Sequence, residues 1–197
     1  MITVAETTLR KFTNKAAHNV LADEFGNLIS DTIGHSIVVT DIDHYLIHTG
    51  KTWVWSDKVT VANGVTKLFL IKNGATSAIH VKEFNFTSLI GNADLYIYSA
   101  PTITTNGTER TLANKHLGMQ GDTPYSKVYE DPTVSANGTQ KEYFQLPGSK
   151  QSGGSISGGN DEWIIPANVN FIFSYTNNGP GTDTVGFSIK ILDVGDL

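Results

Sequence analysis

The sequence predicts an all-β fold: an antiparallel β-sandwich, jelly-roll-like, preceded by an N-terminal arm. Two observations lead to this prediction. From residue 35 onward, short segments rich in β-branched and aromatic residues recur at the spacing of roughly 8–12 residues that is typical of sandwiches and barrels. In addition, a decapeptide that carries a strong turn signal occurs twice.

The expected strands alternate apolar and polar residues, as a half-buried strand does. Trp53 and Trp55 share one face of their strand, and Tyr96 and Tyr98 share one face of theirs. In the expected strand 67–71, every residue after Lys67 is apolar, which is typical of a strand covered on both sides. In chain order, the expected strands are 36–40, 45–48, 52–56, 67–71, 78–86, 93–98, 162–166, 170–176 and 185–191.

The repeated decapeptide reads PTITTNGTER at 101–110 and PTVSANGTQK at 132–141, so the second copy begins 31 residues after the first. Asn-Gly flanked by β-branched residues is the strongest short-range signal for a β-hairpin. A type I′ turn requires positive φ at both central residues, which Asn and Gly tolerate. The sequence therefore predicts hairpin turns at Asn106-Gly107 and at Asn137-Gly138.

The chain divides into an arm, residues 1–34, and a β-sandwich domain, residues 35–197. The arm has weak periodicity, with a short helix expected near 13–21. Such an arm either orders against a neighbouring subunit or packs on its own domain. Within the domain, residues 148–159 are so rich in Gly and Ser that they predict a mobile surface loop.

Composition excludes several classes of function. Charged residues make up 17% of the chain, against about a quarter in typical proteins, and the net charge is −5. Nucleic-acid binding relies on a basic surface, so no nucleic-acid partner is expected. The absence of cysteine excludes disulfides and thiolate chemistry. We expect neither a membrane span nor an export signal.

Potential metal ligands gather in one short stretch. They are Asp41, Asp43, His44 and His48, with His35 or His80 as a further candidate. No zinc spacing rule is met, so we interpret them as residues at a hairpin end and expect no metal. Gly50-Lys51-Thr52 matches only the tail of a phosphate-binding loop, and we interpret it as a tight turn between strands. No nucleophile elbow is present, and no cofactor is expected.

The candidate binding residues are Trp53, Trp55 and Trp163, with the seven tyrosines of the chain as further aromatic groups. Aromatic side chains in a strand can form a platform on which sugars stack, but they more often belong to a core or to a subunit interface. They indicate a binding site only if they are exposed.

Several features occur in a consistent order along the chain. An aromatic strand is followed by Pro101-Thr102 with Asn106-Gly107-Thr108, by Pro132-Thr133 with Asn137-Gly138-Thr139, by a Gly-rich loop, and by 162–166. In this order the chain, over roughly residues 40 to 192, resembles small β-sandwich proteins encoded among tailed-bacteriophage head genes. These are auxiliary capsid, decoration or cement proteins, and the resemblance implies no catalytic residues.

We therefore expect a structural virion protein that decorates or cements a tailed-phage capsid and is not an enzyme. Its partners would be the major capsid protein or other virion proteins, and it would be made in the host cytoplasm. Low charge and many strand edges favour a homo-oligomer, with a trimer as the leading form. The alternatives are a carbohydrate-binding module of a phage fibre or spike and, less favoured, a β-sandwich hydrolase.

Overall fold

The computed structural model describes residues 21–22, 28–29, 42–74, 77–89, 91–119, 123–146, 154–157 and 162–193. The chain forms two compact units, Met1–Ile42 and Asp43–Leu197. In the first unit, β1 (Leu21–Ala22) and β2 (Leu28–Ile29) pair antiparallel. The predicted helix over 13–21 lies outside the described residues except for Leu21, which begins β1. The predicted strand 36–40 also lies outside them.

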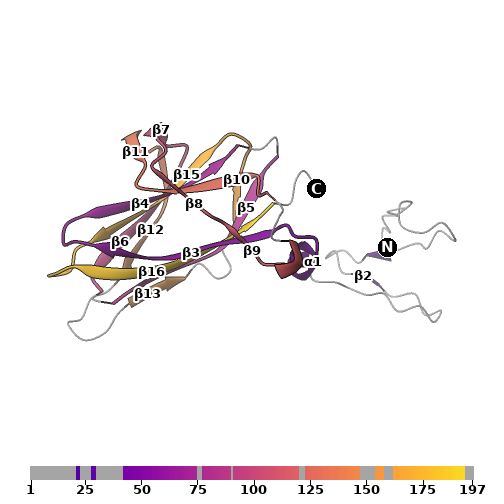
Figure 1. Cartoon of the computed structure of the whole chain (residues 1–197), viewed down its shortest axis with the longest axis horizontal. Helices are drawn as coiled ribbons and strands as arrows, with labels where there is room; N and C mark the ends of the chain where they lie inside the picture. The colour runs from indigo at the N-terminus through magenta and orange to yellow at the C-terminus, as the bar shows by residue number, and fades with distance from the viewer. Residues whose placement is uncertain are drawn as a thin grey trace, which may run out of the picture. The chain divides into compact units, whose positions relative to one another are not determined.

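The second unit is an antiparallel β-sandwich, which confirms the predicted fold class (Figure 1). Sheet A has the strand order β12 (Thr139–Leu146), β6 (Ala93–Ser99), β15 (Asn170–Asn177), β4 (Thr66–Asn73), β10 (Ser126–Glu130), β8 (Thr108–Arg110). Sheet B has the order β13 (Gly154–Ser157), β5 (Ile79–Ser88), β16 (Asp183–Leu192), β3 (Thr52–Val61), β9 (Ala113–Asn114), and β14 (Trp163–Ile165) also pairs with β5. A short 3₁₀ helix, η1 (Leu117–Met119), follows β9.

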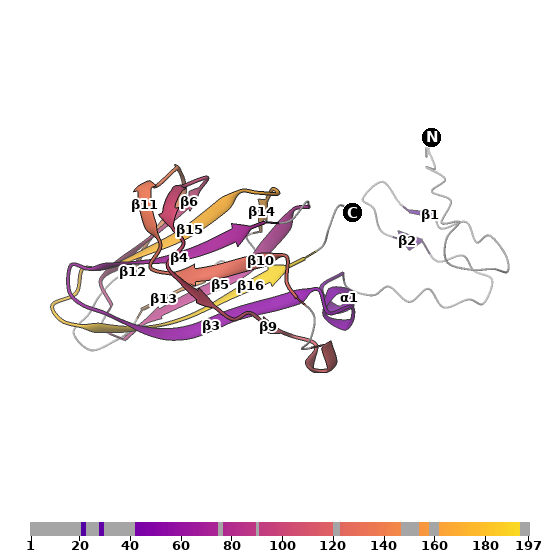
Figure 2. The same ribbon diagram turned by 45° about the horizontal axis from the view of Figure 1, so that its top comes forward.

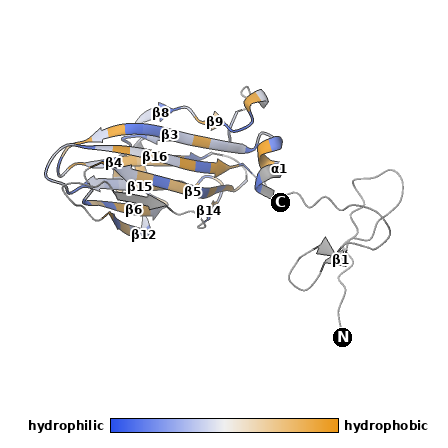
Figure 3. Cartoon of the chain, turned by 90° about the horizontal axis from the view of Figure 1, so that it is seen from below, coloured by the Kyte–Doolittle hydropathy of each residue, from blue (hydrophilic) through white to orange (hydrophobic). Residues whose placement is uncertain are grey.

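The core between the two sheets is built from aromatic and branched side chains that alternate along the strands. On β3 and β16 this alternation shows as successive hydrophilic and hydrophobic bands (Figure 3). Phe69 of sheet A lies 4.5 Å from Phe187 of sheet B between ring centroids, and Trp55 meets Phe187 edge-on at 5.0 Å. Such edge and tilted pairs stabilise a core beyond the burial of their area. Within residues 67–71, the prediction of cover on both sides holds for Phe69, Leu70 and Ile71, which are fully buried, whereas Lys67 and Leu68 are partly exposed. Ile103 and Val134 pack over Leu70 on the outer face of sheet A.

The prediction of a strand over 45–48 is wrong, because Ile42–His48 forms the helix α1. The C-terminal end of this helix shows how Gly50 and Lys51 are used. Gly50 has φ +70°, the Lys51 amide donates to Leu46 O at 2.8 Å, and the Gly50 amide donates to Ile47 O at 3.0 Å. This pair of bonds is the Schellman motif, with glycine at the left-handed position after the helix. Gly50-Lys51 is therefore a helix stop and not a turn between strands.

The Gly/Ser-rich segment was predicted to be a loop throughout, and this is wrong for residues 154–157. They form β13, which pairs with β5 from Gly154↔Ser88 to Ser157↔Asn85. Strand pairing uses backbone amides and carbonyls, so Gly and Ser can extend a sheet edge although they contribute little side-chain packing. The rest of 148–159 lies outside the described residues.

A buried aspartate holds each end of β16. At its start, Asp183 accepts hydrogen bonds from the Tyr175 hydroxyl at 2.8 Å, from the Leu89 amide at 3.0 Å, and from Ser88 Oγ. Just past its end, Asp193 accepts from the Tyr125 amide at 3.0 Å. Burial raises the pKa of Asp193 to about 6, although the Tyr125 bond opposes this shift.

Candidate functional site

The two copies of the repeated decapeptide lie side by side and pair with each other. Their central segments form β7 (Thr102–Thr105) and β11 (Thr133–Ala136), a separate two-stranded antiparallel sheet that we call the ribbon. The register runs through Thr133↔Thr105, Val134↔Ile103 and Ala136↔Thr102. The ribbon stands out from sheet A in two different views (Figures 1 and 2).

The predicted hairpins are therefore wrong. β7 and β8 flank Asn106-Gly107 but do not pair with each other, since β7 pairs with β11 and β8 pairs with β10. Gly107 has φ +85° and Gly138 has φ +81°, whereas neither Asn106 nor Asn137 has positive φ. A type I′ turn would require it of both. The asparagines instead lead each strand of the ribbon back to an edge of sheet A.

Each glycine of the repeat is packed against the backbone of the other copy. A Cβ on Gly107 would lie 2.7 Å from the carbonyl carbon of Asp131 and closer still to Glu130 O. A Cβ on Gly138 would lie 2.7 Å from the carbonyl carbon of Ala100 and closer still to the oxygen of the residue before it. Real Cβ contacts are not this short, so both positions admit only glycine without movement of the backbone.

The strands that follow the two glycines, β8 and β12, also contact the other half of the repeat. β8 of the first copy pairs with β10, which leads into the second copy, through Thr108↔Glu130. β12 of the second copy pairs with β6, which leads into the first, through Thr139↔Ser99. Each residue of one pair lies 31 positions from its counterpart in the other. The two copies are thus related by a local two-fold axis, and each completes the sheet edge of the other.

The residues before the two prolines obey the same relation. Ala100 and Asp131 both have φ +53°, an uncommon value outside glycine. The Ala100 amide donates to Asn170 O of β15 at 2.9 Å, and the Asp131 amide donates to Leu68 O of β4 at 3.0 Å. These equivalent bonds turn both chains away from sheet A and into the ribbon.

The axis passes through the middle of sheet A and out through the ribbon. Leu70 of β4 is paired with Ile172 of β15 at the sheet centre, and Ile103 is paired with Val134 in the ribbon. These four side chains belong to one small cluster, with Leu70 and Ile172 fully or almost fully buried. The ribbon is therefore held on sheet A by this apolar contact as well as by the backbone hydrogen bonds of Ala100 and Asp131.

The outer surface of the ribbon is polar and uncharged. Its hydroxyls again bond reciprocally: Thr104 Oγ1 donates to Thr133 O at 3.0 Å, and Ser135 Oγ donates to Thr102 O at 3.4 Å. All four of these residues are exposed. Thr and Ser lose little rotamer freedom when a partner covers them, which suits a surface that docks against protein.

Charges lie at the foot of the ribbon on one side. Arg110 donates to Glu130 at 2.9 Å, and Lys67 forms ion pairs with Asp131 and, at 3.8 Å, with Glu130. Two basic and two acidic groups offset one another there. The positions equivalent to Glu130 and Asp131 are Ser99 and Ala100, and the position equivalent to Arg110 is Lys141. The two copies therefore share a backbone plan, but the two carboxylates occur on one side only.

The tryptophans do not form a platform. Trp53 and Trp55 are 3% and 1% exposed, so neither can stack on a ligand. Trp163 is half-buried and packs on Phe171, with ring centroids 5.8 Å apart. Trp53 and Trp55 share one face of β3, as the sequence predicts, and this face is turned into the core.

An aromatic group that sequence reasoning did not single out lies on the outer face of sheet A. Tyr143 is exposed, and its ring centroid lies 4.8 Å from that of Tyr96, which lies 6.0 Å from Tyr98. The Tyr143 hydroxyl donates to Asp94 at 2.8 Å. The alternation of Tyr96 and Tyr98 in the sequence indicates that both lie on one face of their strand. That Tyr143 joins them depends on the pairing of β12 with β6, which the sequence does not reveal.

The group of potential metal ligands does not converge. Asp43 is paired with Lys82 at 2.5 Å and with Lys190 at 3.4 Å, whereas His80 is bonded to Glu162 at 2.7 Å. His48 lies edge-on to His116 at 6.3 Å. Asp41, His35 and the His44 side chain lie outside the described residues. Within the described part of the chain, no three His, Cys, Asp or Glu side chains could hold a metal ion.

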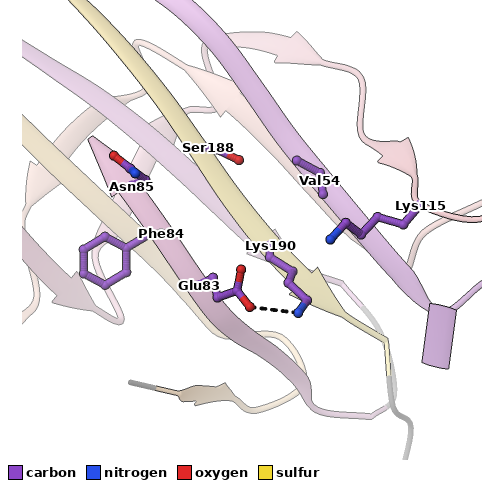
Figure 4. A pocket seen from close by; sticks show the side chains of 7 residues that line it. All are labelled: Val54, Glu83, Phe84, Asn85, Lys115, Ser188 and Lys190. Carbon is purple, nitrogen blue, oxygen red and sulfur yellow. Dashed lines mark hydrogen bonds and ion pairs between the residues drawn. The ribbon is translucent and has the colours of Figure 1, made fainter. Parts of the chain in front are cut away.

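A polar trough runs along β16 on the outer face of sheet B (Figure 4). One hollow of ≈ 360 Å³ lies at its Lys190 end, and a second of ≈ 260 Å³ adjoins it at Gly186, with Asn85 and Ser188 lining both. Lys190, buried in the wall, donates to Glu83 at 2.9 Å. The trough exists because β16 carries small outward residues between larger neighbours. It offers hydrogen-bond donors and acceptors, whereas the rings of Phe84 and Phe187 that adjoin it are buried in the core and offer no face for stacking.

Comparison with known proteins gives no family. No protein-family model matches the chain, and no curated protein matches it. Similar solved structures come from infectious bursal disease virus. A chain from the Gx strain is 10% identical with a TM-score of 0.19, over 72% of this chain and 40% of that one. A chain from the Gt strain is 13% identical with a TM-score of 0.19, over 93% and 48%. The chain thus spans under half of each, and these TM-scores carry no argument about function.

No helix in the described part of the chain is long and apolar enough to cross a membrane.

Proposed function

We propose that the chain is a structural protein of a virion, which binds an assembled capsid as a decoration or cement protein and performs no catalysis. The observation that carries the proposal is the ribbon. It is an exposed, uncharged element whose conformation is fixed by the close packing of Gly107 and Gly138 against backbone. A pre-ordered polar surface of this kind suits docking against protein, because little conformational entropy is lost when it binds.

The resemblance to auxiliary head proteins of tailed phages supports the same function and suggests the major capsid protein as partner. A homo-oligomer, with a trimer as the expected form, stays a prediction from the sequence. Trp53 and Trp55 lie in the core, so they are not part of the surface through which such an oligomer would form.

The test is to find the chain on particles. Virions banded in a density gradient and washed with high salt should retain the chain at a fixed ratio to the major capsid protein, measured by quantitative mass spectrometry. Particles without the chain, purified from cells that contain it in abundance, would contradict the proposal.

A second candidate function is carbohydrate binding at the trough. The observation that favours it is the line of hydroxyl, amide and charged groups between β5 and β3, in which Lys115 forms no ion pair with any residue that the structure describes. Sugar hydroxyls would bond to such groups. On a glycan array, Lys115→Ala and Asn85→Ala should abolish a signal that Thr60→Ala, exposed on β3, leaves intact. An array without signal for the parent protein would exclude this function for the glycans it displays.

A further inference from the structure

The local two-fold axis gives the ribbon a surface that repeats after half a turn. Three pairs of exposed positions are equivalent about the axis: Thr102 with Thr133, Thr104 with Ser135, and Thr105 with Ala136. All six residues are uncharged, and the pairs differ only in that Thr105 carries a hydroxyl, bonded to Thr133 at 2.8 Å, that Ala136 lacks, and that Ser135 is one methyl group smaller than Thr104. The ribbon therefore offers nearly the same chemistry to a neighbour on either side of the axis.

We propose that the ribbon docks on a two-fold axis of its partner, so that a single chain contacts two copies of one capsid subunit. This inference rests on the proposed function and adds the geometry of the binding. A surface that repeats about an axis is matched on both sides only by a partner that repeats about the same axis. Each half of the ribbon then makes the same contact with one of the two subunits.

The energetic reason is bivalency. When one half of the ribbon is bound, the other half faces the second subunit at a high effective concentration, so two weak contacts act as one strong contact. This requires that both halves hold a fixed position. The backbone contacts of Gly107 and Gly138 and the equivalent bonds of Ala100 and Asp131 supply this rigidity on both sides of the axis.

The charge cluster at the foot of the ribbon does not oppose this arrangement. Lys67, Arg110, Glu130 and Asp131 pair among themselves, so they present no net charge that a symmetric partner would meet on one side only. A trimer centred on the ribbon, by contrast, would place a two-fold surface on a three-fold axis, where its two halves could not make equal contacts.

The first experiment is a count. Purified capsids prepared without this chain are titrated with the full-length protein, and bound copies per capsid subunit are measured by gel densitometry after sedimentation. We expect no more than one chain per two subunits at saturation. One chain per subunit, or three chains whose ribbons meet on one three-fold axis of the capsid, would overturn the inference but leave the proposed function standing. No binding at all would overturn both.

The second experiment uses matched variants, Thr104→Arg and Ser135→Arg. Each introduces the same side chain at equivalent positions and removes an equivalent hydroxyl bond. We expect each to weaken capsid binding about tenfold or more, with the two agreeing within about threefold. Thr60→Arg on β3 should bind as the parent does. If only one of the two ribbon variants loses affinity, the contact is one-sided and the inference is wrong.

Thermal melts show whether the variants are folded. If the arginine variants unfold, Thr105→Lys and Ala136→Lys provide a second equivalent pair at exposed positions, with the same expected agreement and the same refuting result.

Discussion

Replacing Gly107 or Gly138 by alanine should destabilise the domain far more than the same change at Gly64. All three glycines have positive φ, at +85°, +81° and +72°. The conformational penalty of a Cβ is therefore similar at all three, about 1 kcal/mol. They differ in their surroundings, because nothing lies within 4 Å of a Cβ on Gly64. Gly64→Ala is thus a matched control that measures the conformational penalty alone.

At Gly107 the obstacle is backbone, which cannot rotate away as a side chain can. Glu130 is paired in β10, and the Asp131 amide is bonded to Leu68. Making room would break a few of these hydrogen bonds, each contributing about 1 kcal/mol, and would loosen the apolar contact beneath the ribbon. The total for Gly107→Ala, and for Gly138→Ala by the same reasoning, is about 3 kcal/mol against about 1 kcal/mol for Gly64→Ala.

Urea unfolding and thermal melts measure the difference. For a chain of this size, about 3 kcal/mol corresponds to a Tm lower by roughly 6–12 °C, and about 1 kcal/mol to roughly 2–4 °C. The two ribbon variants should agree within about 0.5 kcal/mol, because their environments are equivalent. If Gly64→Ala lowers Tm as much as they do, the backbone contacts contribute nothing and the reasoning is refuted.

Three further predictions concern the buried aspartates. A folded-state pKa near 6 for Asp193 means that folding takes up a proton, so its contribution to stability falls by about 2–3 kcal/mol as pH rises from about 4 to above 6. Asp193→Asn should remove that fall in urea titrations at several pH values, and an unchanged pH profile would contradict it. Tyr175→Phe removes a hydroxyl that donates to Asp183 and should cost about 1–2 kcal/mol in urea unfolding. Asp183→Ala should cost more, because it leaves the buried hydroxyls of Ser88 and Tyr175 without their acceptor and removes one of the two acceptors of the Leu89 amide; a cost no larger than that of Tyr175→Phe would count against the network.

The strands were predictable because their signal is local. When apolar residues recur at every second position, as Trp53 and Trp55 do, the sequence predicts which side chains face inward, whichever strand pairs with this one. The helix α1 was missed because seven residues are too few to show a helical period. Its signal was Gly50, which can end a helix as well as turn between strands.

The ribbon could not be predicted from local signals. Asn-Gly favours a hairpin, but whether the flanking strands pair with each other depends on what else can pair with them. Here β8 and β12 each pair with the strand that leads into the other copy. The hint was the repeat itself, since two like segments can pair about a two-fold axis. The strand β13 was missed for another reason: its pairing involves the backbone, and its composition is typical of a loop.

The exchange of strands between the two copies also constrains the order in which the chain can fold. As the protein is synthesised from its N-terminus, β6 and β8 are complete before β10, β11 and β12 exist. Until then both strands have open edges, and Gly107 has no carbonyl to rest against. Neither copy can therefore complete its pairings before the other has been synthesised. Pairings so distant in sequence fold slowly, and a chain interrupted before residue 132 would expose unpaired edges that favour aggregation.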